Sequence, residues 1–248
     1  MFDAISGFFL DLYEKTGLNF NIFYDEFEYD RVLAGAVTSL ELMAWVICLS
    51  IVLGVIGASL QHMGSRTLKG LVEAYVQVFR NTPPMVQLLF FYFGLGSITP
   101  QVDMGGYNEP LISSFAWAVI GLSVFGAAYN VEIFRSGIES VPRSTLEASE
   151  SLCLTKWQTN LHIVLPLAIR VSLPSLTANV ISLAKTTSLV YVISVPEMTY
   201  VLNQIWSDSM NVPEMIFVLF LFYGIVIALI GAVFSLLERK LRIPGFGQ

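Results

Sequence analysis

Charged side chains and cysteines are scarce in this chain. Only 13% of its 248 residues are Asp, Glu, Lys or Arg, whereas 55% are hydrophobic. The two cysteines, Cys48 in an apolar run and Cys153 in a polar block, are expected far apart and in a reducing setting, which argues against a disulfide or a metal site. This composition excludes an ordinary soluble domain and indicates an integral membrane protein.

Residue types needed for catalysis are also few. The only histidines are His62 and His162, both near predicted span ends, and no predicted span contains two Asp residues. An intramembrane hydrolase therefore lacks its nucleophile and base or its paired acids, and we assign no catalytic residue. The chain also lacks the G-x-x-x-x-G-K-[S/T] phosphate loop, so it is not expected to bind ATP or any other cofactor itself.

Long hydrophobic runs are what the chain has instead. A helix needs about 20 apolar residues to cross the roughly 30 Å hydrocarbon core of a bilayer. The runs 42–60, 85–102, 111–131 and 215–237 meet or approach this length. A fifth run, 162–184, contains Arg170 and two prolines but is otherwise apolar and long enough. The sequence therefore predicts an all-α membrane protein with about five spanning helices, and Pro166 is expected to mark a helix start or a kink.

The distribution of Lys and Arg predicts the orientation, because cytoplasmic loops retain these residues. They follow the first and third runs and the last run, at Arg66, Lys69, Arg135, Arg143, Lys156, Arg239, Lys240 and Arg242. We therefore expect the N-terminus outside and the C-terminus inside, with 1–32 an acidic periplasmic segment, 2–10 an interfacial helix and 241–248 a cytoplasmic tail. The acidic residues responsible for the net charge of −6 then lie mostly on the outer face of the membrane. Nothing in the sequence supports nucleic-acid binding.

A polar block, SVPRSTLEASESLCLTKWQTNLHIVLP, separates the third run from the fifth. Ser144 and Glu147 have the S-x-x-E spacing of a capping box, and Thr155 and Gln158 have the equivalent T-x-x-Q spacing. These spacings predict two short helices in succession. On pattern alone, the block is either a docking element for a soluble partner or an ordinary surface helix pair.

The block resembles the "EAA" loop of membrane subunits of ATP-binding-cassette (ABC) importers. That loop reads Glu-Ala-Ala, then a Gly four residues on, then Ile-x-Leu-Pro. The matching stretch here is EASESLCLTKWQTNLHIVLP, which runs from 147 to 166. Three further strings narrow the resemblance to permeases for polar amino acids: FRNTPPMVQLLFFYFGL at 79–95, GAAYNVEIFRSGIESVP at 126–142 and LAKTTSL at 183–189. The resemblance covers roughly 33–240.

This resemblance implies a type I importer fold in the bacterial inner membrane, with a permease domain at 33–240 and a cytoplasmic coupling loop at about 138–162. Two cytoplasmic ATPase subunits would hold ATP and Mg, and a soluble amino-acid-binding protein would dock outside. Five spans are too few to enclose a path, so a second permease subunit, a paralogue or a copy, is implied. The coupling residues carried over are Ser144, Glu147, Ala148, Ser149, Leu152, Cys153, Leu154 and Pro166.

Two departures from the family pattern bear on function. Cys153 stands where the family has Gly, at a turn that often needs left-handed backbone geometry. Either Cys153 adopts that geometry at a cost of about 1 kcal/mol, or a different turn avoids it and alters the coupling bend. Thr186 stands where many relatives have an Asp that would suit a substrate ammonium. Both departures favour a paralogous partner that keeps the fuller motifs. The missing Asp also favours an acidic or neutral substrate over a basic one.

Polar residues within or near the spans are candidates for the substrate path, because buried charges in spans are costly and mark transport routes. The candidates are Arg80, Thr82, Glu132, Arg170, Lys185, Thr186, Thr187 and Ser188. Snorkelling to an interface, structural ion pairs and subunit packing remain the alternative roles for these residues. An autonomous secondary carrier or a channel remains the alternative function, although neither needs a coupling block.

Overall fold

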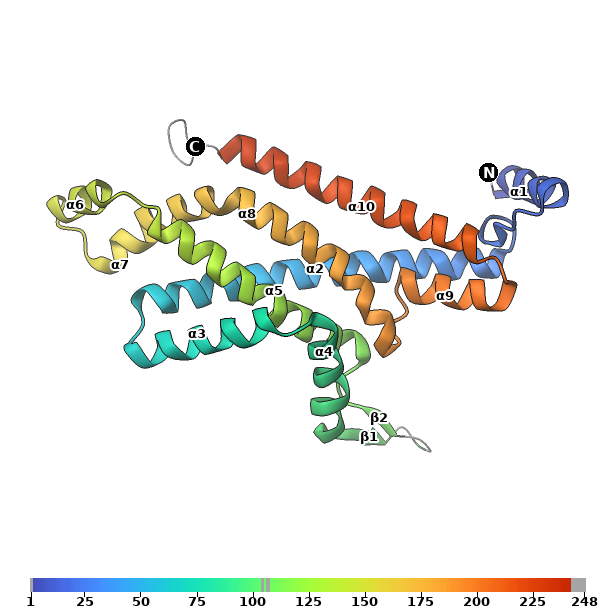
Figure 1. Cartoon of the computed structure of the whole chain (residues 1–248), viewed down its shortest axis with the longest axis horizontal. Coiled ribbons are helices and arrows are strands. Elements are labelled where there is room, and N and C mark those ends of the chain that lie inside the picture. Colours follow the sequence, from blue (N-terminus) through green and yellow to red (C-terminus); the bar gives the residue numbers. More distant parts are fainter. Residues whose placement is uncertain (1, 104, 106–107, 242–248) are drawn as a thin grey trace. The chain divides into compact units, whose positions relative to one another are not determined.

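The computed structural model describes residues 2–103, 105 and 108–241, and Figure 1 shows these elements in chain order. The α-helices are α1 (Phe2–Thr16), α2 (Glu26–Met63), α3 (Arg66–Asn81), α4 (Pro84–Leu89), α5 (Ser114–Glu139), α6 (Arg143–Ser151), α7 (Lys156–Thr159), α8 (Leu165–Thr186), α9 (Met198–Ser209) and α10 (Val212–Leu241). Short 3-10 turns lie at Asn21–Phe23, Gly96–Ile98 and Thr187–Ile193, and π turns at Phe90–Leu95 and Asn160–Val164.

Four helical stretches among the described residues are long and apolar enough to cross a membrane: Glu26–Met63, Ser114–Glu139, Lys156–Ile193 and Val212–Leu241. Four of the five predicted runs lie largely within them. The helix predicted at 2–10 is also confirmed, and it extends to Thr16.

The predicted run 85–102 forms a shorter helix than expected. Its helical stretch covers only Pro84–Ile98 and ends before Pro100. Pro100 pushes the residue before it out of the helical region, and Thr99 has the extended angles φ −78° and ψ 146°. Two short antiparallel strands follow, β1 (Gln101–Asp103) and β2 (Asn108–Pro110), with Val102 paired to Glu109. The all-α prediction is therefore correct apart from this hairpin.

Helix α3 occupies a segment that the sequence analysis treats as a loop. Ser65 caps it by accepting a hydrogen bond from the Leu68 backbone N–H. Its inward face repeats at helical spacing through Val72, Tyr75, Val76 and Phe79, with Val76 fully buried. Because α3 is amphipathic and carries Arg66 and Lys69, it is too polar to register as a hydrophobic run.

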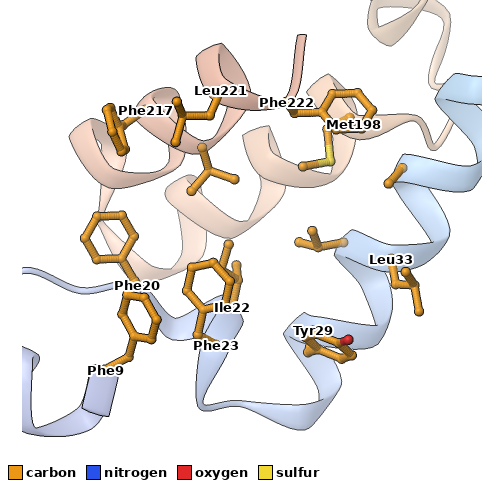
Figure 2. Close-up of a pocket in the computed structure, with 13 residues that line it drawn as sticks. Phe9, Phe20, Ile22, Phe23, Tyr29, Leu33, Met198, Phe217, Leu221 and Phe222 are labelled. Atoms are coloured by element: carbon orange, nitrogen blue, oxygen red, sulfur yellow. The ribbon is translucent and has the colours of Figure 1, made fainter. Parts of the chain in front are cut away.

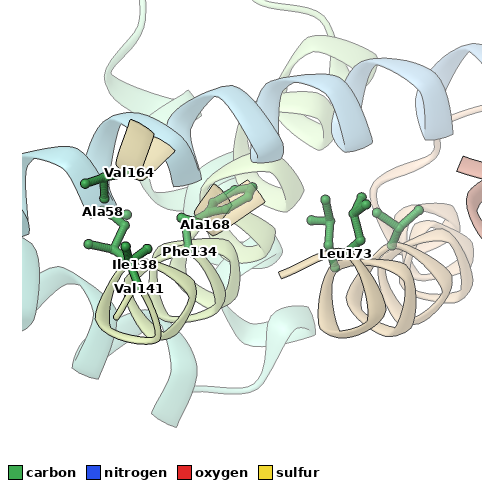
Figure 3. Packing of buried hydrophobic residues seen from close by; sticks show 9 residues of the cluster. Ala58, Phe134, Ile138, Val141, Val164, Ala168 and Leu173 are labelled. Carbon is green, nitrogen blue, oxygen red and sulfur yellow. The ribbon is translucent and has the colours of Figure 1, made fainter. Parts of the chain in front are cut away.

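The chain divides into two compact units. One unit is built from the stretch up to residue 45 together with 88–119 and 184–228, and the other from 46–87, 120–183 and the stretch from 229 onward. The core of the second unit joins α2, α5 and α8, with Ala58, Phe134, Ile138, Val164 and Ala168 buried together (Figure 3).

The first unit is organised around a buried acid at the start of α9. Glu197 is completely buried, and its carboxylate accepts hydrogen bonds from the backbone N–H groups of Thr199 and Tyr200, at 2.9 and 3.0 Å. The Tyr223 hydroxyl donates to the same carboxylate at 3.0 Å, and the Ser39 hydroxyl at 3.4 Å. Burial raises the pKa of this carboxyl, while the backbone donors oppose the rise. Glu197 thus ties α9 to α2 and α10.

Proline explains the irregular entrance to α8. A π turn at Asn160–Val164 immediately precedes Leu165 and Pro166. Proline has no N–H, and its ring clashes with the carbonyl four residues back, so a widened turn accommodates it. The predicted irregularity at Pro166 is confirmed as a π turn within one continuous helical stretch, and Pro174 lies inside α8 without ending it.

Candidate coupling surface and transport path

The first short helix of the polar block, α6, begins earlier than the Ser144 capping box predicts. Pro142 occupies the N-cap position with φ −61° and ψ 142°, and its carbonyl accepts from the Thr145 N–H at 3.0 Å. Ser144 is already helical and cannot cap, so the predicted box of Ser144 and Glu147 is wrong. Within the described chain, no side-chain hydrogen bond holds Glu147, which is exposed.

The turn between the two short helices has left-handed geometry, the first of the two outcomes expected for Cys153. Cys153 has φ 54°, its N–H donates to the Glu150 carbonyl at 2.9 Å, and the Leu154 N–H donates to the Ser149 carbonyl at 3.2 Å. This is the arrangement that normally favours glycine at a helix C-terminus. The turn therefore keeps its shape although Cys replaces Gly.

The second short helix, α7, starts with the predicted capping box. The Thr155 hydroxyl accepts from the Gln158 N–H at 3.3 Å, and the Gln158 side chain accepts from the Thr155 N–H at 2.9 Å. Ser149 joins α7 to α6: it is buried, donates to the Leu146 carbonyl at 2.7 Å and accepts from the Thr159 hydroxyl at 3.1 Å. The small Ser149 side chain therefore locks the two helices together.

We name residues 143–159 the coupling element. It presents apolar side chains among charges of both signs: Leu152 is 72% exposed and Trp157 61% exposed, and Glu147 and Ala148 are exposed on α6. Leu154 is only half-buried, and Pro166 is exposed just beyond. Trp157 is missing from the predicted set, although a lone Trp in a polar block is a signal that sequence reasoning could have used. Exposed Leu and Trp on so polar a segment favour contact with a protein partner.

A pocket of about 410 Å³ lies between the coupling element and the end of α2. His62 and Met63 line it from α2, and Leu146, Glu150 and Lys156 line it from the coupling element. The coupling element and the end of α2 thus face the same pocket, and Leu146 packs against the core cluster that contains Ala58 of α2. A force applied to α6 and α7 would reach α2 through this contact.

Two of the predicted path residues come together in the second unit. Arg80, in the last turn of α3, lies 3.5 Å from Glu132 of α5 and stacks over the Tyr129 ring at 5.3 Å. Arg135 also pairs with Glu132 at 2.9 Å. Thr82 accepts from the Gln87 amide and donates to the Val78 carbonyl at 2.8 Å, which ends α3. Arg170, on α8, is exposed and forms no ion pair with any described residue.

The remaining path candidates lie where α8 changes to a 3-10 turn. Thr187 is buried and donates to the Ala184 carbonyl at 2.8 Å, and Ser188 donates to the Lys185 carbonyl at 2.9 Å. These hydroxyls satisfy carbonyls that the change of helix type releases, which is a structural role. Lys185 is exposed and Thr186 partly buried.

Uncharged polar residues that sequence reasoning missed connect three spanning helices. Asn130 of α5 is fully buried, donates to the Ser50 hydroxyl of α2 at 3.2 Å and accepts from Asn179 of α8 at 2.8 Å. Gly54 faces Asn130, and a Cβ there would collide with it. A lone Asn inside an apolar span is the signal that marks such interhelical hydrogen bonds.

Serines that sequence reasoning missed line a small pocket between α5 and α8 together with the predicted Glu132. This pocket has a volume of about 260 Å³, and its lining includes Glu132, Ser136, Ser140, Ser172 and Ser175. The Ser172 hydroxyl donates to the Ile133 carbonyl and the Ser140 hydroxyl to the Gly137 carbonyl. Their lone pairs therefore remain available as acceptors beside the Glu132 carboxylate.

A family model described as "Binding-protein-dependent transport system inner membrane component" matches residues 50–243, more than half of the chain. The chain belongs to this family. It is thus a multi-pass permease subunit of the inner membrane in an ABC importer, and ATP hydrolysis resides in partner subunits, as the sequence predicted.

Known relatives confirm the resemblance to amino-acid permeases. The chain is 35% identical to the "Probable amino-acid ABC transporter permease protein PatM" of Vibrio harveyi, over 83% of this chain and 89% of that one. It is 30% identical to the "Glutamate/aspartate import permease protein GltJ" of Escherichia coli strain K12, over 84% and 85%.

Solved structures show the same fold. A crystal structure of an amino acid ABC transporter with histidines superimposes with a TM-score of 0.73 at 26% identity, covering 94% of this chain and 98% of that one. The MetNI methionine ABC transporter in an inward-facing conformation gives a TM-score of 0.70 at 19% identity, covering 88% and 100%, and this likeness concerns the fold alone.

Proposed function

We propose that this permease carries an amino acid into the cell and that the coupling element docks on a cytoplasmic ATPase subunit. The observation that carries the proposal is the coupling element itself. Its turn at Cys153 is fixed by backbone hydrogen bonds, while Glu147, Leu152 and Trp157 stay exposed for a partner. ATP binding would draw the docked elements of two permeases together, and the contact with α2 would pass the movement to the spanning helices.

The proposed topology has five crossings, with the N-terminus outside and the C-terminus inside. The four long helices supply four crossings, and the stretch that contains Pro84–Ile98 supplies the fifth, shortened one. The positions of Arg135, Arg143 and Lys156 support a cytoplasmic coupling loop at about 138–162. The acidic segment 1–32 then faces the periplasm, 33–240 forms the permease domain, and 241–248 is a cytoplasmic tail.

The proposed complex contains two permease subunits, two ATPase subunits that bind ATP and Mg, and a soluble amino-acid-binding protein. Only four long spans and one short apolar helix are described here, which supports a second permease to complete the path. We infer that the second permease is a paralogue rather than a copy, because Thr186 replaces the family's acidic residue in this chain.

The proposed solute path in this subunit passes Glu132, Arg80 and the serine-lined pocket. Hydroxyl lone pairs and a carboxylate suit the ammonium group of an amino acid, and Arg80 suits its carboxylate. Arg170 and Lys185 add exposed cations on the helix that ends at Thr186. An acidic or neutral amino acid fits this balance better than a basic one.

Uptake of radiolabelled amino acids into cells that lack the native permease tests the proposal. Transport should require ATP hydrolysis by the partner, and Glu147→Ala should abolish uptake while membrane insertion stays normal. Native mass spectrometry of the tagged assembly should find an ATPase and a second permease. Uptake that continues without an ATPase subunit would instead establish an autonomous carrier or channel.

A further inference from the structure

An apolar pocket of about 490 Å³ lies near the N-terminal ends of α2 and α10 (Figure 2). Thirteen residues line it, and the Tyr29 hydroxyl is the only oxygen or nitrogen that their side chains contain. A polar ligand would leave its groups unpaired against this apolar lining. The occupant must therefore be apolar.

Most of the pocket lining precedes the part of the chain that the family model matches. Eight of the thirteen lining residues precede residue 50, where the family match begins. Phe9 of α1 and Phe20 and Phe23 of the following turn form one wall, and Figure 2 shows these rings side by side. Phe9 stacks on Phe23 with ring centroids 4.3 Å apart. The N-terminal segment thus supplies most of the pocket lining.

The aromatic wall is fixed in place by hydrogen bonds to the other side of the same unit. The Asn19 N–H donates to the Glu214 carboxylate at 3.0 Å, and the Asn211 amide donates to the Asn19 carbonyl at 2.9 Å. Asn21 donates to the Ser209 hydroxyl at 3.1 Å. These bonds join the turn before α2 to the α9 and α10 junction, so the pocket is preformed.

The open side of the pocket continues onto surfaces of helices that cross the bilayer. Leu33 of α2 is 53% exposed, and Phe217 and Leu221 of α10 are 53% and 42% exposed, while all three line the pocket. Beyond Met215, Val226 is the one buried residue among the described residues of α10. The apolar molecule that reaches such a surface is a lipid. We propose that the pocket holds one acyl chain of a bilayer phospholipid.

The charges around the pocket select the headgroup. Residues 1–32 contain seven acidic side chains and two basic ones. Both bases are engaged: Lys15 pairs with Asp11, and Arg31 pairs with Glu28 at 2.9 Å and with Gln204 at 2.6 Å. Acidic side chains therefore outnumber basic ones in the segment that supplies the aromatic wall, and they repel an anionic headgroup held close to it. The site prefers a zwitterionic phospholipid with an ammonium group, such as phosphatidylethanolamine, over phosphatidylglycerol.

The test uses the intact complex in mild detergent, titrated with palmitoyl-oleoyl phosphatidylethanolamine or phosphatidylglycerol and followed by native mass spectrometry. The wild type should retain one phosphatidylethanolamine per chain and bind it at least threefold more tightly than phosphatidylglycerol. Leu221→Trp fills the pocket and should weaken retention about tenfold. Leu229→Trp, on the 62% exposed lipid side of the same helix and outside the pocket, should leave retention unchanged.

Equal retention by the wild type, Leu221→Trp and Leu229→Trp would overturn the acyl-chain site. Preferential binding of phosphatidylglycerol would overturn the headgroup assignment. Loss of the complex in Leu221→Trp with unchanged lipid retention would assign the pocket to a partner segment instead. Leu33→Trp fills the pocket from α2 and provides a second variant if Leu221→Trp does not fold. None of these readouts depends on the solute or on ATP.

Discussion

Glu147 and Glu197 are used in contrasting ways by the two regions that contain them. Glu197 is completely buried at the start of α9 and accepts four hydrogen bonds from α2, α9 and α10. Glu147 lies exposed on the coupling element, and no described residue holds its side chain. Glu197 finds its hydrogen-bond partners within the chain. The coupling element instead has a hydrogen-bonded backbone and exposed side chains that a partner protein can contact.

This difference separates fold from function in the molecule. A buried carboxylate that accepts four hydrogen bonds fixes neighbouring helices and is costly to remove. An exposed carboxylate beside exposed Leu152 and Trp157 contributes little to the fold and is available to a partner. Substitutions in the two regions should therefore separate stability from transport.

The largest stability effect is expected for Glu197→Ala. This change removes the cap of α9 and leaves the Ser39 and Tyr223 hydroxyls without their acceptor, so we expect a loss of about 3 kcal/mol or more. Thermal unfolding of the purified chain in detergent measures it. Glu147→Ala is the matched control and should melt like the wild type. Equal melting temperatures for Glu197→Ala and Glu147→Ala would refute the claim that Glu197 stabilises the fold and Glu147 does not.

A transport effect without a large stability effect is expected for Glu132→Gln. The neutral amide releases Arg80 and Arg135 and removes the carboxylate from the serine-lined pocket, so uptake should fall about tenfold, equivalent to roughly 1.4 kcal/mol. Glu139→Gln is the control, because Glu139 pairs with Arg135 but does not line that pocket. Similar uptake by Glu132→Gln and Glu139→Gln would show that Glu132 does not line the solute path.

A smaller, local effect is expected for Thr155→Ala. The Thr155 hydroxyl caps α7, and its loss should destabilise this helix by about 1 kcal/mol. Hydrogen exchange at the amides of 156–159 should accelerate accordingly. Ser144→Ala should change nothing at α6, because Ser144 does not cap that helix. Faster hydrogen exchange in α6 of the Ser144→Ala variant would show that Ser144 does cap this helix, as its S-x-x-E spacing predicts.

The smallest effect is expected for Cys153→Gly. Glycine adopts φ 54° without the penalty of about 1 kcal/mol, but its greater freedom in the unfolded chain offsets part of this gain. Exchange around 150–154 should therefore slow by a small factor. Cys153→Val adds a β-branched side chain at the same angle and should accelerate exchange. Acceleration in both variants would show that the thiol itself stabilises the turn.

Sequence patterns predicted the features that hydropathy and turn chemistry encode. Long apolar runs located the four long helices, and the T-x-x-Q spacing located the start of α7. The position of Cys153 in the motif left open whether the turn is left-handed or altered, and the structure shows the left-handed angle. Each of these signals is local, so neighbouring residues alone determine the outcome.

Features that depend on distant contacts were not predicted. Helix α3 is stabilised by packing of its inward face and by the Tyr75 hydroxyl, which donates to the Val124 carbonyl at 2.5 Å. Asn130 joins residues 80 positions upstream and 49 downstream, and no local pattern indicates such partners. The capping box predicted at Ser144 is wrong for a local reason, because Pro142 is the N-cap and the helix begins before Ser144.

Co-purification of the ATPase subunit with tagged permease variants tests the role of the coupling element most directly. Leu152→Asp places a charge on the exposed apolar part of the element and should eliminate the ATPase from the purified complex. Met210→Asp, at an even more exposed position (84%) beyond α9, should retain it. Retention of the ATPase by Leu152→Asp at wild-type levels would contradict the proposal that the coupling element is the docking surface.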